Sequence, residues 1–382
     1  MSGAPSPPTT VEDILVLPYD TTWIGGPDLT RVPGHGRIYR EGRGFNDSWP
    51  EREINAASAR RVEGRYLYGG PFKDHFGHAL TDSIVRAYAF DRSRHDGIVF
   101  VPLAGRQPAL PRYFLDMLAL FGIGPEDVHL VQEPTQFAAL EFAEPGSLLG
   151  AGARDWYPAI LERVRERLHE KRRGREITLP KKLYFGRVHI LHKGTLMGES
   201  YLSAMLERAG FTYIKPEAFD LFDQLAMIEA AEEIVFTEGS SIYSVELLPK
   251  LDARVFMLPR RGALALFQPH LRHVRSLTML GGRSNCWRLT GRSDRNAPSS
   301  PSYARRPEAI HADMVAAGLV NEPFDQAQFE ARERRDATRY FKDKRGDQQV
   351  SAIRVLREEL RVAAEARALR RSKRAENEAE SA

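Results

Sequence analysis

Residues 232–249 read "EEIVFTEGSSIYSVELLP", and this stretch decides the fold. An apolar run typical of a buried strand leads into a glycine and two serines, and a helical pattern follows at once. Gly239 lets the backbone come close to a ligand, and Ser240 and Ser241 are suited to cap the helix. Free N–H groups at the start of a helix attract anions. The stretch predicts an anion-binding strand-to-helix turn, with an ordinary tight turn as the alternative.

Strand and helix patterns alternate on both sides of this stretch. Strand patterns cover 65–70, 97–104, 127–132, 181–187, 211–216, 233–238 and 253–259. Helix patterns cover 72–92, 112–123, 156–176, 198–210, 221–232 and 240–250. Alternation of this kind is typical of parallel sheets covered by helices, and two such lobes in tandem bind ligands in the cleft between them.

The chain of 382 residues is long enough for two cores. We expect an α/β protein with two Rossmann-like, doubly wound lobes and a helical C-terminal tail. The expected divisions are an extended lead-in at 1–60, an N-terminal lobe with its linking helix at 61–175, a second lobe at 176–295 and a charged tail at 296–382. The apolar stripe of the tail is narrow, which favours a solvated helix or a partner-docking arm.

Composition narrows the classes of function. The 55 Lys and Arg against 51 Asp and Glu leave a net charge of only +4, which argues against a dedicated nucleic-acid binder and is compatible with a phosphorylated small ligand. Cys286 is the sole cysteine, so no internal disulfide or cysteine zinc cage can form, and we expect a buried free thiol. The first twenty residues resemble no secretory signal, and no apolar run reaches the length of a membrane span. We expect a cytoplasmic protein, with peripheral association at the inner face of the membrane as an option.

Residues 72–83, "FKDHFGHALTDS", set His75, His78 and Asp82 three and four residues apart. On a helix these side chains share one face. They can perform acid-base chemistry, bind a metal such as zinc or iron, or satisfy one another in a core.

Residues 183–194, "LYFGRVHILHKG", supply cations. Arg187 follows a predicted strand, where the carboxyl end would deliver it into the cleft, and His189, His192 and Lys193 follow on the loop. The Arg fork suits two phosphate oxygens, whereas Lys is a point charge. An ordinary surface charge is the alternative.

These segments occur in a recognisable order. Residues 74–88, "DHFGHALTDSIVRAY", precede "LYFGR" and then 197–249, which begin "MGESYLSAMLERAG" and end in the opening stretch. Together they resemble glycosyltransferase family 61, over about residues 65–260. The resemblance implies an inverting transferase of the two-lobed GT-B type, which uses a nucleotide-sugar donor and no further cofactor. The donor would lie in the second lobe, and the acceptor and base in the first.

The resemblance also implies roles for particular residues. The matching positions are His78 and Asp82 in the first lobe, and Arg187, Glu199, Gln224, Gly239 and Ser240 in the donor site. Two positions depart from the family: Gly198 replaces an Asn, and Glu238 stands where many members have His. A carboxylate would repel a diphosphate, so we expect either that Glu238 holds a sugar hydroxyl or the ribose, or that the donor is an unusual one. Bacterial members often build surface polysaccharides, which implies a glycan or lipid-linked glycan acceptor, as in capsule biosynthesis.

The residues are consistent with a metal-independent mechanism. No two aspartates are separated by one residue, so the Asp-x-Asp motif that holds a divalent ion is missing. Arg187, Lys193 and the turn at Ser240 and Ser241 would neutralise the leaving group. We expect Asp82 to be the base, with His78 the next candidate and His75 a positioning group. The alternatives are a metal-dependent enzyme that uses these three residues, and a non-catalytic protein that binds a partner or itself through its tail.

Overall fold

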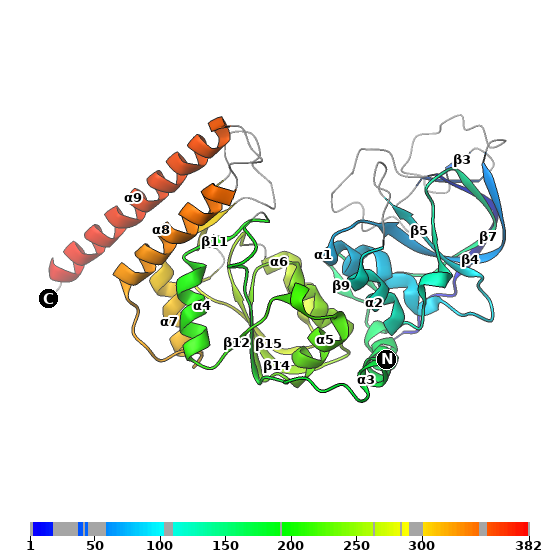
Figure 1. The fold of residues 1–382 in the computed structure, drawn as a ribbon, viewed down its shortest axis with the longest axis horizontal. Coiled ribbons are helices and arrows are strands. Elements are labelled where there is room, and N and C mark those ends of the chain that lie inside the picture. Colours follow the sequence, from blue (N-terminus) through cyan, green and yellow to red (C-terminus); the bar gives the residue numbers. More distant parts are fainter. Residues whose placement is uncertain are drawn as a thin grey trace.

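The chain forms two α/β lobes followed by C-terminal helices in a computed structural model (Figure 1). The first lobe (blue to cyan) lies beside the second (green to yellow), and the last two helices (orange and red) lie on the side of the second lobe away from the first. The structure describes residues 3–17, 37–40, 43–44, 59–102, 110–191, 193–262, 264–282, 285–289, 301–343 and 350–380. The expected α/β class and the two lobes are confirmed.

The first lobe contains a mixed sheet of seven strands in the order β3-β2-β1-β7-β4-β5-β6. The strands are β1 (Thr9–Leu17), β2 (Arg37–Arg40), β3 (Arg43–Gly44), β4 (Arg60–Phe72), β5 (Gly97–Pro102), β6 (Val128–Leu130) and β7 (Thr135–Phe142). Strands β7, β4, β5 and β6 are parallel, whereas β1 pairs with β7 antiparallel. This lobe therefore differs from the expected doubly wound sheet, because strands of the lead-in extend it with antiparallel pairs.

The second lobe contains a parallel sheet of five strands in the order β12-β10-β13-β14-β15. The strands are β10 (Lys182–Phe185), β12 (Thr212–Tyr213), β13 (Glu233–Thr237), β14 (Leu251–Leu258) and β15 (Val274–Met279). The chain order reverses between β10 and β13, and the carboxyl ends of strands at such a point leave a crevice for ligands.

Helices cover both faces of the second sheet. Alternate strand residues point to opposite sides of a sheet, and here the residues on both sides are apolar and need to be covered. Phe185 and Phe236 pack in the large core shared with the first lobe, together with α2 (Arg112–Leu120), α3 (Tyr157–Arg172) and α5 (Leu221–Ala230). Tyr184 and Val235 pack in the opposite core, with α4 (Glu199–Arg208) and α7 (Pro307–Ala316). One continuous apolar core thus joins the two lobes.

The remaining described elements outside Phe76–Ala89 and Ser240–Leu247 are short apart from the last two helices. They are β8 (Ser147–Leu148), β9 (Gly152–Ala153), β11 (Leu196–Met197), β16 (Cys286–Arg288), β17 (Ser302–Ala304), α6 (Leu264–Phe267), α8 (Gln326–Asp343), α9 (Val350–Glu380) and single turns at Pro125–Asp127, Pro216–Ala218 and Gln268–Leu271. In the part of the chain that the structure describes, no helix combines the length and the apolar character that a bilayer span requires.

The α8 part of the tail is not a solvated arm, which corrects the sequence-based expectation for this helix. Helix α8 packs against α4, and its Phe329 is fully buried in the core beside Tyr201. Strand β17 extends β11 in parallel. Figure 1 shows α9 running alongside α8. The tail as far as α8 therefore completes the second lobe, whereas most described residues of α9 are exposed and only Ala363 and Arg367 are buried.

Charged residues that are buried on α8 explain why its apolar stripe is narrow in the sequence. The Asp336 carboxylate accepts hydrogen bonds from the N–H groups of Gly198 (3.1 Å) and Ser200 (3.2 Å) at the start of α4. Arg367 of α9 binds Glu333 of α8 through both terminal nitrogens, and the two side chains are 5% and 7% exposed. Polar residues thus occupy positions that face the interior, because their partners are buried with them.

Candidate functional site

The segment with the two histidines is helical but irregular. His75 lies before the helix in an extended conformation, α1 covers only Phe76–His78, and a π-helical turn at Ala79–Ser83 and a 3-10 turn at Ile84–Ala89 follow. The wider π turn still brings His78 Nδ1 within 2.6 Å of Asp82 Oδ2. Such turns are frequent at functional sites. The expected single helical face is therefore wrong for His75 and correct for the pair.

His75 nevertheless remains close to this pair. Its ring lies edge-on to that of His78, with ring centroids 5.0 Å apart. Burial, together with the charges of His78, Lys73 and Lys193, lowers the pKa of His75 to about 4. Its Nδ1 has no hydrogen-bond partner among the described residues. His75 is thus neutral at pH 7, and because Lys193 belongs to the second lobe, the two lobes meet here.

Arg187 lies just beyond the carboxyl end of β10, as expected from the sequence. Its Nη2 donates to the carbonyls of Lys193 (2.8 Å) and Gly194 (3.2 Å), and its backbone N–H donates to Glu199 Oε1 (2.5 Å). Glu199 is completely buried, and burial raises the pKa of its carboxyl group. The carboxylate also accepts hydrogen bonds from the hydroxyl groups of Tyr184 and Thr237. Glu199 therefore holds Arg187 in place and does not line the cavity described below.

The turn at the end of β13 brings the backbone close to Arg187. A Cβ atom at Gly239 would lie 2.9 Å from Arg187 Nη1, so only glycine allows this approach without displacing the guanidinium. The expected α-helix after the turn is a 3-10 helix, Ser240–Leu247, and no side chain caps it. The serines do not act as caps because the 3-10 turn begins directly at Ser240. Ser240 and Ser241 line the cavity instead.

Glu238 points into the protein, which corrects the expectation that it holds a sugar or ribose. Its Oε2 accepts from the backbone N–H groups of Arg260 (2.9 Å), Arg261 (2.6 Å) and Gly262 (2.9 Å). Its Oε1 accepts from Arg261 Nε at 3.3 Å. Three successive N–H groups after β14 form a small anion-binding nest. The Glu238 charge is therefore neutralised inside the protein.

The tail explains the other departure, Gly198. This residue has φ +84° and precedes α4. A Cβ atom here would lie within 2.6 Å of two ring carbons of Phe329. Asn tolerates a left-handed backbone, but its Cβ would overlap this ring. Glycine at 198 is thus required by the packing of α8.

A cavity of about 540 Å³ lies between the lobes at the carboxyl edge of the second sheet. Its walls come from α1 and α2 of the first lobe, the loop after β10, the start of α5 and the turn after β13. The lining residues are Phe76, Arg112, Tyr113, Asp116, Gly186, Arg187, Ile190, Lys193, Pro216, Glu217, Phe219, Asp220, Leu221, Gln224, Ser240 and Ser241. Ser240 also lies against Gly77, where a Cβ atom would be 2.9 Å away, so the histidine segment adjoins the cavity.

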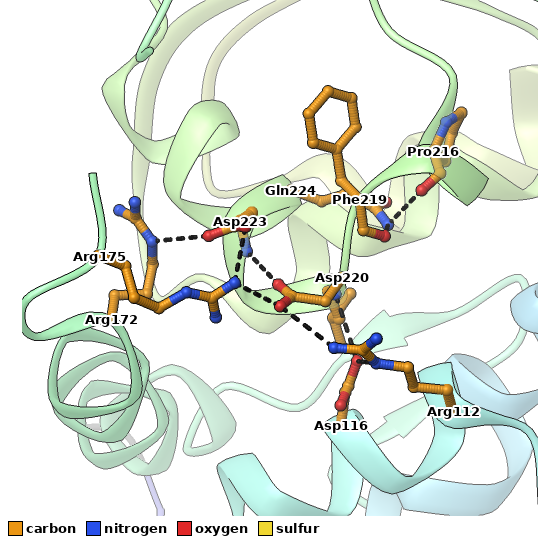
Figure 2. A network of polar contacts seen from close by, with 10 residues as sticks. Arg112, Asp116, Arg172, Arg175, Pro216, Phe219, Asp220, Asp223 and Gln224 are labelled. Carbon is orange, nitrogen blue, oxygen red and sulfur yellow. Dashed lines mark hydrogen bonds and ion pairs between the residues drawn. The ribbon is translucent and has the colours of Figure 1, made fainter. Parts of the chain in front are cut away.

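A polar network crosses from one lobe to the other at the rim of the cavity (Figure 2). Asp220, which caps α5, pairs with Arg175 (2.5 Å) and with Arg112 of α2 (3.5 Å). Asp223 pairs with Arg175 (2.8 Å) and with Arg172 at the end of α3 (3.2 Å). These ion pairs fix α5 relative to the first lobe.

Gln224 shapes the cavity wall through the backbone beside it. Its Nε2 donates to the carbonyls of Pro216 (2.8 Å) and Phe219 (3.0 Å), as Figure 2 shows. The loop between them leaves Phe219 40% exposed at the wall of the cavity. A cavity-lining aromatic ring of this kind is a surface on which a flat ligand can stack.

Cations gather at the carboxyl ends of β10 and β14. Burial and the charges of Arg187 and Arg261 lower the pKa of Arg260 to about 9. Burial also lowers the pKa of Arg187, with a further contribution from Arg261. Three guanidinium groups thus repel one another at this edge, and Glu238 and Glu199 are the carboxylates that act on them. Such a cluster favours the binding of an anion.

Sequence reasoning missed several residues of this site. Arg112, Tyr113 and Phe219 line the cavity but carried no motif. Arg261 does not line the cavity, although its charge acts on Arg187, and its position just after a strand on the ligand-binding edge was the available signal. His189 binds Tyr213 and Glu217 beside the loop, and His192 lies outside the described residues.

The site holds no preformed cluster of metal ligands within the described ranges. No group of three or more His, Cys, Asp or Glu side chains is arranged there to hold a metal ion, and His78 binds Asp82 directly. Cys286 is a half-buried free thiol whose pKa is raised by burial.

Comparison with known proteins gives no family assignment: no family model matches the chain, and no curated protein matches it significantly.

Proposed function

We propose that this protein is an inverting, metal-independent glycosyltransferase with two Rossmann-like lobes of the GT-B type. It transfers a sugar from a nucleotide-sugar donor to a glycan or lipid-linked glycan acceptor in surface polysaccharide synthesis, as the resemblance to family 61 implies. One observation carries the proposal: a cavity between the lobes is lined by Arg187 and Lys193 on one side and by Phe76 on the other, and Phe76 begins the helical segment that holds the His78–Asp82 pair.

The donor occupies the cavity in this proposal. The cavity volume of about 540 Å³ lies within the range of small-molecule sites. Its aromatic side chains suit a nucleobase, and Arg187, Lys193 and the N–H groups at Ser240 suit the phosphates. Glu238 does not oppose this, because its carboxylate is bound inside the protein.

The first lobe supplies the base. The acceptor oxygen attacks the anomeric carbon as the bond to the leaving phosphate oxygen breaks, and the acceptor proton passes to the His78–Asp82 pair. Asp82 is the assigned base, oriented by His78 Nδ1 at 2.6 Å. Arg187 and Lys193 neutralise the charge that develops on the phosphate.

Donor binding and sugar transfer are tested separately. A thermal-shift screen of the full chain against common nucleotide sugars identifies the donor, and transfer or hydrolysis is then followed with that compound. Asp82→Asn should lower the rate by about 10²–10⁴-fold with donor affinity retained, because it removes the proton acceptor and keeps the side-chain shape.

Asp252→Asn provides the matched control, since this exposed aspartate pairs only with Lys250 among the described residues. His78→Ala should cost less than Asp82→Asn if His78 only orients the carboxylate. Wild-type transfer by both variants would refute the assignment, and a chain that binds and cleaves no nucleotide sugar would refute the proposed function.

A further inference from the structure

The cluster of arginines contains a second guanidinium with the same design as Arg187. Arg187 is held through Nε and Nη2 by the carbonyls of the loop after β10, and Nη1 has no hydrogen-bond partner among the described residues. Arg261 is held through Nε by Glu238, and neither of its terminal nitrogens has a described partner. Each guanidinium group is therefore held through part of its N–H groups, and its other N–H groups have no hydrogen-bond acceptor among the described residues.

The sheet places these two groups on either side of the turn after β13. Strands β10, β13 and β14 are neighbours in that order and are parallel, so Arg187, Gly239 and Arg261 follow their carboxyl ends in a row. The side chain of Arg261 is 21% exposed, whereas that of Glu238 is completely buried. The buried carboxylate thus supports a guanidinium that reaches solvent.

We propose that Glu238 positions Arg261 as a second guanidinium for the anion that Arg187 binds. The inference rests on the proposed function only in taking that anion to be the donor phosphates. It also explains why Glu, and not His, stands at residue 238. The Glu238 carboxylate binds the backbone N–H groups of residues 260–262 and orients the guanidinium of Arg261. Mutual repulsion between the guanidinium groups is relieved when an anion lies between them.

Binding of inorganic pyrophosphate to the full chain tests this arrangement, because it needs neither the correct nucleobase nor the correct sugar. Calorimetry at constant low ionic strength should show roughly tenfold or greater weakening for Arg261→Gln, the scale of a lost charged hydrogen bond. Arg261→Lys should recover only part of the affinity, because it keeps the charge and loses the bond through Nε. Arg208→Gln is the charge-matched control, since Arg208 binds Glu322 at an exposed site on α4.

For Glu238→Gln, the direction of the change in pyrophosphate affinity is the test. If Glu238 only added negative charge near the anion, its neutralisation would strengthen pyrophosphate binding. If Glu238 positions Arg261, the same change weakens binding several-fold and has no further effect in the Arg261→Gln background. Glu322→Gln controls for the change in net charge, and melting temperatures verify that each variant is folded.

The outcomes separate this inference from the proposed function. Wild-type pyrophosphate affinity in Arg261→Gln, or tighter binding in Glu238→Gln, would overturn the inference and leave sugar transfer unaffected. A wild-type chain that binds no pyrophosphate would overturn it as well. Failure of the proposed function is seen independently, as the absence of nucleotide-sugar cleavage and transfer.

Discussion

Replacing Gly198 tests whether the tail is part of the second lobe. The left-handed backbone at this residue should cost about 1–2 kcal/mol once a Cβ is present. Overlap with the Phe329 ring should add about 1–3 kcal/mol, the usual cost of overpacking a core. Gly198→Ala should therefore lower the free energy of unfolding by clearly more than backbone strain alone.

The Phe329→Ala background isolates the contact. This change alone should destabilise by about 3–5 kcal/mol, because the ring is fully buried. In this background Gly198→Ala should cost only the backbone part, about 1–2 kcal/mol. The two changes should thus be non-additive, with a coupling free energy of about 1–3 kcal/mol.

Gly210 provides the matched control at the other end of α4. It has φ +87°, but no atom lies within 4 Å of the position of its Cβ. Gly210→Ala should cost the same in both backgrounds. Urea denaturation followed by circular dichroism measures all six free energies. If Gly198 and Phe329 behaved additively, as Gly210 should, the packing of α8 on α4 would be refuted.

Three further predictions concern the site. Arg187→Ala should weaken nucleotide-sugar binding by about 1.5–3 kcal/mol, the value of a charged hydrogen bond, and unaltered affinity in calorimetry would contradict it. Gly239→Ala should weaken donor binding with little change in melting temperature, because the tight contact of its Cβ is with Nη1 at the end of the Arg187 side chain, whereas the Thr237 carbonyl (3.4 Å) and Arg187 Cδ (3.5 Å) lie at ordinary contact distances. His75 should destabilise the fold in acid, since its pKa lies below the unfolded value of 6.5. The stability of the wild type relative to His75→Gln should therefore fall by up to roughly 3 kcal/mol from pH 6.5 to 4, and a parallel pH dependence of the two proteins would refute this.

The second lobe could be predicted because its signals are local. Buried strands such as 233–238 are short apolar runs, and Gly210 marks the end of α4 with a left-handed backbone. Each strand then delivers the next residues to the same edge of a parallel sheet. Arg187 and the Gly239 turn were found for this reason.

Features that depend on distant partners could not be predicted. Glu238 is satisfied by N–H groups that follow another strand, and Asp336 by those at the start of α4. Neither partner is visible in the local pattern, so Glu238 was expected to face a ligand and the tail that contains Asp336 was expected to be solvated. Strand β7, Thr135–Phe142, was missed because its sequence lacks a strong apolar run. It is held as a strand by pairing with β4, which the local sequence does not show.

The contribution of α8 and α9 to the second lobe has a consequence for synthesis on the ribosome. The sheet begins at Lys182, but Phe329 and Arg367 must emerge before the face covered by α4 is closed. At 5–20 residues per second, this interval lasts roughly 10 to 40 seconds. The strands of the first lobe have all been translated by then. We therefore expect the nascent chain to need chaperone protection chiefly during translation of the second lobe.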